Sequence, residues 1–130
     1  MPTVLVVDDD PDIRNLVRLA LQRSGYGVLE AGDGRIALDV VAADHPDLVL
    51  LDLSMPVLDG HATLAALRSD PATADLPVVI ISALSTVVDR RELLAAGAQR
   101  FVGKPFLPRQ LVETVAEVLG RLQGAERGVS

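Results

Sequence analysis

Residues 46–60 read Pro-Asp-Leu-Val-Leu-Leu-Asp-Leu-Ser-Met-Pro-Val-Leu-Asp-Gly, an apolar run followed by acidic and turn-forming residues. The run Leu48–Leu51 is apolar without alternation, which is typical of a strand that is covered on both faces in a parallel sheet. Asp52 follows this strand directly, and Pro56 with Asp59-Gly60 prevents regular structure from continuing. A carboxylate at the end of a buried strand loses hydration, so it needs a cation or strong hydrogen bonds.

A second acidic strand end lies near the N-terminus. The apolar run Val4–Val7 is followed by Asp8, Asp9 and Asp10. Asp52 alone could simply cap a loop, because Asp favours turns. Two such strands lying side by side would instead bring several carboxylates to one edge of a sheet. Clustered carboxylate oxygens suit Mg²⁺ or Mn²⁺, so the pattern predicts a site for a hard divalent cation.

Size and composition limit the possible functions. The chain has 130 residues, the size of one domain, with 49% apolar and 2% aromatic residues, so the core must be aliphatic. Its net charge of −6 argues against direct nucleic-acid binding, which requires a basic face. There is no cysteine, and no apolar run is long enough to cross a bilayer. We therefore expect a cytoplasmic protein that does not associate with membranes.

Strand and helix patterns alternate five times along the chain. The expected strands are Thr3–Val7, Tyr26–Glu30, Leu48–Leu51, Val78–Ile81 and Arg100–Val102. Asp10 and Asp59 are suited to cap two of the intervening helices, and the helix near residues 86–96 has the least regular apolar pattern. This order with short connections predicts an α/β fold, a parallel sheet with helices on both faces. We assign residues 1–123 to one domain and 124–130 to a short C-terminal tail.

Several polar residues fall at the carboxyl ends of the expected strands, where such sheets bind ligands. They are Asp8, Asp9, Asp52, Ser82 and Lys104. Lys104 is the only lysine among the basic residues, and a compact ammonium after a strand suits a phosphoryl group. Asp52 would then be either a metal ligand alone or also a nucleophile. The metal and Lys104 would spread the negative charge of the transferring oxygens.

Four motifs together resemble the receiver domain of two-component response regulators. They are Val6-Val7-Asp8-Asp9-Asp10-Pro11, Leu51-Asp52-Leu53-Ser54-Met55-Pro56 with Asp59-Gly60, Ser82-Ala83, and Ala96-Gly97-Ala98 leading through Phe101 to Lys104-Pro105-Phe106. The resemblance runs from Thr3 to about Leu122. It implies a CheY-like, flavodoxin-like doubly wound fold with strand order 2-1-3-4-5.

The resemblance also implies a phospho-acceptor and a metal site. Asp52 would accept a phosphoryl group from a sensor histidine kinase or a histidine phosphotransfer protein. Asp9 would bind Mg²⁺ directly, and Asp8 would help through a water molecule. The backbone carbonyl of Ser54 would be a further ligand beside Asp52.

Other residues would respond to the phosphoryl group. Ser82 would hydrogen-bond a phosphoryl oxygen, Ala83 would leave room for it, and Lys104 would pair with it. Phe101 would be the aromatic residue that turns inward as Ser82 moves, although packing in the core explains Phe101 nearly as well. The Lys104-Pro105 peptide bond would be cis.

The chain departs from the family pattern at three places. Phe101 stands where tyrosine is common, so a switch there would rest on packing alone. Leu84, two residues after Ser82, is expected to slow the loss of the phosphate. Gln99-Arg100 replaces an acidic pair of regulators that dimerise through their last helices and strand, so dimerisation by that face is not expected. A weak or phosphorylation-dependent dimer stays open, as does the choice between a downstream protein target and an output domain.

Two other functions fit parts of the pattern. A haloacid-dehalogenase-type phosphatase also uses an Asp after a strand, but it needs an acid two residues later, where this chain has Ser54. A pseudo-receiver would only bind partners, although the intact Asp9, Asp52, Ser82 and Lys104 argue against it. We therefore predict a phosphorylation-dependent signalling switch that is not an enzyme in the usual sense.

Overall fold

The computed structural model describes residues 2–53, 59–82 and 87–127, with only the backbone described at 87–90 and 121–127. Its five parallel strands form one sheet in the order β2-β1-β3-β4-β5. The strands are β1 Thr3–Val7, β2 Gly27–Ala31, β3 Leu48–Asp52, β4 Val78–Ser82 and β5 Arg100–Gly103. The helices are α1 Pro11–Arg23, α2 Gly34–Asp44, α3 Gly60–Ser69, α4 Val87–Ala95 and α5 Pro108–Arg127. The predicted flavodoxin-like fold and strand order are confirmed.

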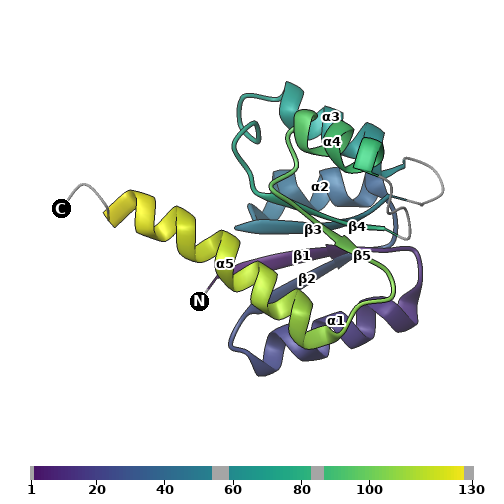
Figure 1. The fold of residues 1–130 in the computed structure, drawn as a ribbon, viewed down its shortest axis with the longest axis vertical. Helices are drawn as coiled ribbons and strands as arrows, with labels where there is room; N and C mark the ends of the chain where they lie inside the picture. The colour runs from purple at the N-terminus through teal and green to yellow at the C-terminus, as the bar shows by residue number, and fades with distance from the viewer. Residues whose placement is uncertain (1, 54–58, 83–86, 128–130) are drawn as a thin grey trace.

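The sheet lies between two layers of helices. Helices α2, α3 and α4 cover one face, and α1 and α5 cover the other (Figure 1). Successive residues of β1 point to opposite faces: Leu5 and Val7 join the core under α2 and α3, whereas Val4 and Val6 join the core under α1 and α5. Helices bury both faces of the sheet, which is why the central strands are continuous apolar runs in the sequence.

Strand register brings the acidic residues together. Val7 of β1 lies beside Leu51 of β3, and Asp52 lies beside Ile81 of β4. Asp8, the residue after β1, therefore emerges next to Asp52. After β1 the chain continues to β2 on one side of the sheet, and after β3 it continues to β4 on the other side. Flavodoxin-like folds bind ligands at this reversal of strand order, outside the carboxyl ends of the strands.

Two predicted caps form at the edge where the acids emerge. The Asp10 side chain accepts hydrogen bonds from the backbone N–H groups of Asp12 and Ile13, at 2.9 and 3.5 Å. The Asp59 side chain accepts one from Ala62 N–H at 2.8 Å. Each cap contributes about 1 kcal/mol to helix stability. The first turns of α1 and α3 are thus stabilised by capping side chains.

Some details differ from the sequence-based expectation. Helix α5 continues to Arg127 and includes Gly120 and Gly124, because each glycine inside a helix costs only about 1 kcal/mol. Leu16 and Ile36 belong to apolar helix patterns, yet they are 48% and 45% exposed at the margins of the buried stripes. Among the described side chains of α4, Leu93 alone is buried. No helix in the described part of the chain combines the length and apolar character needed to cross a membrane.

Candidate functional site

Three carboxylates meet at the carboxyl edge of β1 and β3. One oxygen from each of Asp8, Asp9 and Asp52 can be chosen so that all three lie within 4.8 Å of one another. Asp8 and Asp52 are nearly buried, at 2% and 3% exposure, whereas Asp9 is exposed. Burial strips water from two of the charges, so the cluster needs compensating positive charge.

Lys104 supplies one positive charge to this cluster. Its backbone N–H donates to the carbonyl of Ser82 at 2.8 Å, which continues the pairing of β5 with β4. Its ammonium Nζ lies 3.4 Å from Asp8 Oδ2 and 3.4 Å from Asp52 Oδ1. The long flexible lysine stem lets an ammonium from β5 reach across β4 to the acids.

The charges of the cluster do not balance. Burial alone would lower the pKa of the Lys104 ammonium, but Asp8 and Asp52 outweigh burial and raise the pKa above its ordinary value. Lys104 is therefore charged at neutral pH. Its single positive charge does not balance the negative charges of the three carboxylates. Oxygen ligands with a surplus of negative charge fit a hard divalent cation such as Mg²⁺ or Mn²⁺. Asp8, Asp9 and Asp52 are the described side chains that could hold it.

Three hydrogen bonds fix the position of Asp8. Its N–H donates to the carbonyl of Ala31 at 3.1 Å, which extends the pairing of β1 with β2. Its Oδ1 accepts the N–H of Asp10 at 2.9 Å, and its carbonyl accepts Arg14 Nη1 at 2.8 Å. Asp8 thus has little freedom to move toward or away from a bound ion.

Asp52 is fixed by the close approach of α3. Gly60 N–H donates to the carbonyl of Leu53 at 3.0 Å. A Cβ at Gly60 would lie 2.5 Å from the carbonyl oxygen of Asp52 and 2.6 Å from Leu53 Cα. Because both atoms belong to the backbone, only glycine allows α3 to begin so close to the acid-bearing strand end.

The structure also describes two other predicted site residues, Ser82 and Phe101. Ser82 ends β4 and is buried, at 4% exposure. Phe101 of β5 is partly buried and packs against the core under α2 and α3, as its core-packing interpretation predicts. The Lys104-Pro105 peptide bond is cis, as predicted. Ser54, Ala83 and Leu84 lie outside the described residues.

Two supporting residues were missed in the sequence. Arg14 is an ordinary helix arginine by pattern, and its contact with Asp8 depends on how α1 folds back over β1. Gly60 was recognised only as part of a motif, and its steric role depends on the distance between α3 and β3. Neither role leaves a signal in the spacing of residues.

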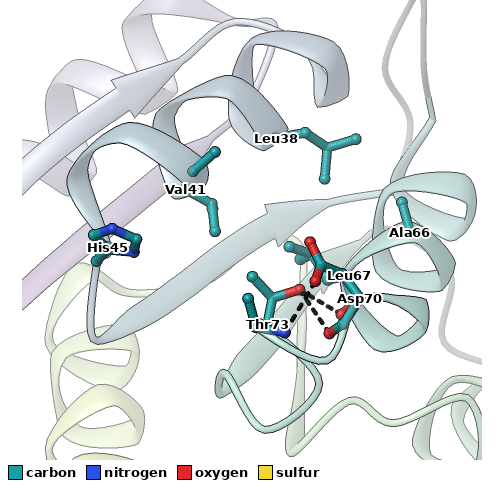
Figure 2. Close-up of a pocket in the computed structure, with 9 residues that line it drawn as sticks. Leu38, Val41, His45, Ala66, Leu67, Asp70 and Thr73 are labelled. Atoms are coloured by element: carbon teal, nitrogen blue, oxygen red, sulfur yellow. Dashed lines mark hydrogen bonds between the residues drawn. The ribbon is translucent and has the colours of Figure 1, made fainter.

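Described residues outside the cluster line two hollows. One, of about 400 Å³, opens beside the site and is lined by Ile13, Leu16, Lys104, Pro105 and Phe106. The other, of about 360 Å³, lies between α2 and α3, and its lining includes the C-cap residues of these two helices, His45 and Asp70 (Figure 2). There Thr73 Oγ1 donates to the carbonyl of Leu67 at 2.6 Å, so its hydroxyl is already used (Figure 2). The lining of the second hollow is otherwise apolar and offers no cluster of reactive groups.

Comparisons with known proteins agree with this geometry. The family model described as "Response regulator receiver domain" matches residues 4–116. The transcriptional regulatory protein PrrA of Mycobacterium tuberculosis is 43% identical over 120 residues, which are 92% of this chain and 51% of that protein. The chain spans about half the length of the curated relatives that it matches.

Solved structures show the same fold. The chemotaxis protein CheY4 of Vibrio cholerae has a TM-score of 0.86 at 34% identity, with 91% of this chain and 98% of that chain covered. The receiver domain of the Francisella response regulator 1452 has a TM-score of 0.88 at 32% identity, with 94% and 99% covered. With these likenesses and the family match, the chain belongs to the response regulator receiver domains of two-component signalling.

Proposed function

We propose that the chain is a phosphorylation-dependent switch in which Asp52 accepts a phosphoryl group with the help of Mg²⁺ or Mn²⁺. One observation carries this proposal: a single ammonium, Lys104 Nζ, lies 3.4 Å from both Asp8 and Asp52 within a surplus of carboxylates. Asp8, Asp9 and Asp52 would hold the cation together with the backbone carbonyl of Ser54. A bound cation would neutralise oxygens of the phosphoryl group during transfer.

The transfer itself is a displacement at phosphorus. One carboxylate oxygen of Asp52 forms an O–P bond while the N–P bond of a donor phosphohistidine breaks. The departing imidazole keeps the electron pair of that bond. Water later cleaves the acyl phosphate, which releases inorganic phosphate and restores the Asp52 carboxylate. The protein supplies a preorganised, partly buried setting for these steps, which is the main source of catalysis in phosphoryl transfer.

Phosphorylation of Asp52 would be sensed by three side chains, those of Lys104, Ser82 and Phe101. The Lys104 ammonium would follow the charge from the Asp52 carboxylate to the phosphoryl oxygens. Ser82 would hydrogen-bond one of those oxygens from the end of β4. Phe101 would then adjust its packing against the core, which would alter the surface around β5. The outcome of the transfer is a modified protein surface until water releases the phosphate, in keeping with signalling proteins that are generally not classed as enzymes.

The partners would be a histidine kinase or histidine phosphotransfer protein upstream and a protein target or output domain downstream. Because Asp52 is only 3% exposed, a donor must approach closely over the rim of the site. The hollow beside Lys104 gives this rim an apolar surface, lined by Ile13, Leu16 and Phe106. We place this exchange in the cytoplasm, without direct binding of the chain to nucleic acid or membrane.

Incubation with Mg²⁺ and acetyl phosphate or carbamoyl phosphate, followed by intact mass measurement, tests the proposal. One added phosphoryl group that requires Mg²⁺ and is lost in Asp52→Asn is the expected result. Steady release of inorganic phosphate without an accumulated adduct would point to a phosphatase. A wild-type protein that neither gains mass nor releases phosphate would be a pseudo-receiver, and the proposal would fail.

A further inference from the structure

We propose that Arg14 is a positioning residue for the metal site: it fixes the Asp8-Asp9 peptide group and so holds the Asp9 carboxylate in place. This inference rests on the proposed function, because it assigns a role in cation binding. Arg14 itself touches only the protein backbone and neighbouring side chains, and it is not a ligand.

Asp9 needs such support because its own side chain has none. Within residues 2–53, 59–82 and 87–127, no hydrogen bond or ion pair engages the Asp9 carboxylate. Asp8, in contrast, is held by the N–H of Asp10 and by Lys104. The direction of the Asp9 side chain is therefore set by its backbone. The peptide plane between Asp8 and Asp9 contains the carbonyl of Asp8, so a contact with that carbonyl orients the backbone on which Asp9 stands.

Arg14 makes this contact and has two further neighbours. Its Nη1 donates to the Asp8 carbonyl at 2.8 Å, and its Nε lies 3.5 Å from Glu30 Oε1. A Cβ added at Gly32 would lie 3.4 Å from Nη1, so the guanidinium also lies against the turn after β2. The planar guanidinium thus links β2 to the end of β1, and a lysine ammonium can reproduce this link only in part.

Charge and position predict opposite effects when Arg14 is replaced. Arg14 is a cation beside a cation site, so through charge alone its removal should strengthen the binding of Mg²⁺. Loss of its hold on the Asp8 carbonyl should weaken binding, because partners that orient metal ligands support affinity. The sign of the change therefore distinguishes a positioning role from a purely electrostatic one.

Arg18 offers a matched control on the same helix. Its Nε lies 3.5 Å from Glu30 Oε2, so it shares the acidic partner of Arg14 and carries the same charge. Its other contacts are with Gln22 and Asn15 on α1, and none reaches Asp8. Arg14→Gln and Arg18→Gln thus remove the same charge and the same kind of ion pair, and only the first removes the contact with Asp8.

The experiment is calorimetric titration of the unphosphorylated full chain with Mg²⁺ at constant ionic strength, repeated with Mn²⁺ by electron paramagnetic resonance. Arg14→Gln should bind Mg²⁺ about tenfold more weakly, the low end for partners of metal ligands. Arg18→Gln should stay within about twofold of the wild type, since exposed ion pairs contribute little. Arg14→Lys should recover part of the loss, because an ammonium can still donate to the Asp8 carbonyl.

Circular dichroism and thermal unfolding would confirm that each variant is folded. Unchanged or tighter Mg²⁺ binding by folded Arg14→Gln would overturn the inference, and so would an equal loss in Arg18→Gln. If Arg14→Gln does not fold, Arg14→Lys decides, and wild-type affinity in it would overturn the inference. If the wild type binds Mg²⁺ and is phosphorylated, but the Arg14 variants bind Mg²⁺ with the same affinity, only this inference fails. A wild type that binds no divalent cation would overturn the proposed function as well.

Discussion

Asp9→Asn should make the metal-free protein more stable, which is an unusual result for a change at a candidate functional residue. The reason is repulsion: the Asp9 carboxylate can approach those of Asp8 and Asp52 within 4.8 Å, and it has no cation partner of its own among the described residues. Asparagine keeps the shape of the side chain and removes its charge. Stability and cation binding should therefore change in opposite directions.

The expected gain can be worked from the distances. Two like charges 4.8 Å apart repel by about 0.9 kcal/mol in water and by about 3.5 kcal/mol at an effective dielectric constant of 20. Asp9 is exposed, so the lower value applies to each of its two neighbours. Attraction to Lys104 and to the N-terminal end of α1 offsets part of this repulsion. Asp9→Asn should therefore raise the free energy of unfolding by about 1 kcal/mol without metal.

The assay is urea unfolding followed by circular dichroism, at low ionic strength, with a chelator or with Mg²⁺. At ten times its dissociation constant, Mg²⁺ should stabilise the wild type by about 1.4 kcal/mol, and it should stabilise Asp9→Asn much less. Asp12→Asn is the control, because Asp12 is an exposed acid in the first turn of α1 outside the cluster. It should be slightly destabilised and should keep the response to Mg²⁺. A metal-free Asp9→Asn that is less stable than the wild type would refute the account of repulsion.

Three further predictions follow from the site. Gly60→Ala should lower the free energy of unfolding by about 1–3 kcal/mol and slow phosphorylation, because its Cβ would meet backbone atoms. Gly120→Ala, which meets nothing within 4 Å, should stabilise α5 by up to about 1 kcal/mol; equal effects of the two changes in thermal unfolding would contradict the steric role. The raised pKa of Lys104 means that its ion pairs stabilise the fold fully below the ordinary value of 10.5 and that this contribution is lost as pH rises through the higher folded value. Lys104→Met should lack that alkaline loss in denaturation curves between about pH 9 and 12, and a wild-type curve from the variant would refute the assignment. Leu84 lies outside the described residues, and the family resemblance alone implies that it flanks the path of the attacking water. On that expectation Leu84→Glu should shorten the half-life of the phosphorylated protein, and an unchanged half-life would count against this role.

The strand ends were predictable from the sequence because one rule governs them. Parallel strands end at the same edge, so acids after two apolar runs and a lysine after a third had to gather there. The structure confirms this for Asp8, Asp52 and Lys104 through two distances of 3.4 Å. The strand order, in contrast, came from the resemblance to a family, since the alternation of strands and helices fits several orders.

Contacts that depend on how elements pack were not predictable. The link from Arg14 to the Asp8 carbonyl requires the position of α1 over β1, and the clash at Gly60 requires the depth at which α3 begins. The length of α5 was not predictable either, because the glycines at positions 120 and 124 are weak stop signals within a helix whose apolar side is well buried. These features depend on tertiary packing. The periodicity of apolar residues in a single sequence indicates helices and strands but not the contacts between them.

The most direct test of the account identifies the atom that carries the phosphoryl group. Protein phosphorylated with acetyl phosphate and Mg²⁺ is treated with sodium borohydride, which reduces an aspartyl phosphate to homoserine, and its peptides are then mapped by mass spectrometry. Homoserine is expected at position 52 alone, and none is expected when Mg²⁺ is chelated. Homoserine at position 8 or 9, or phosphate on a serine, would contradict it.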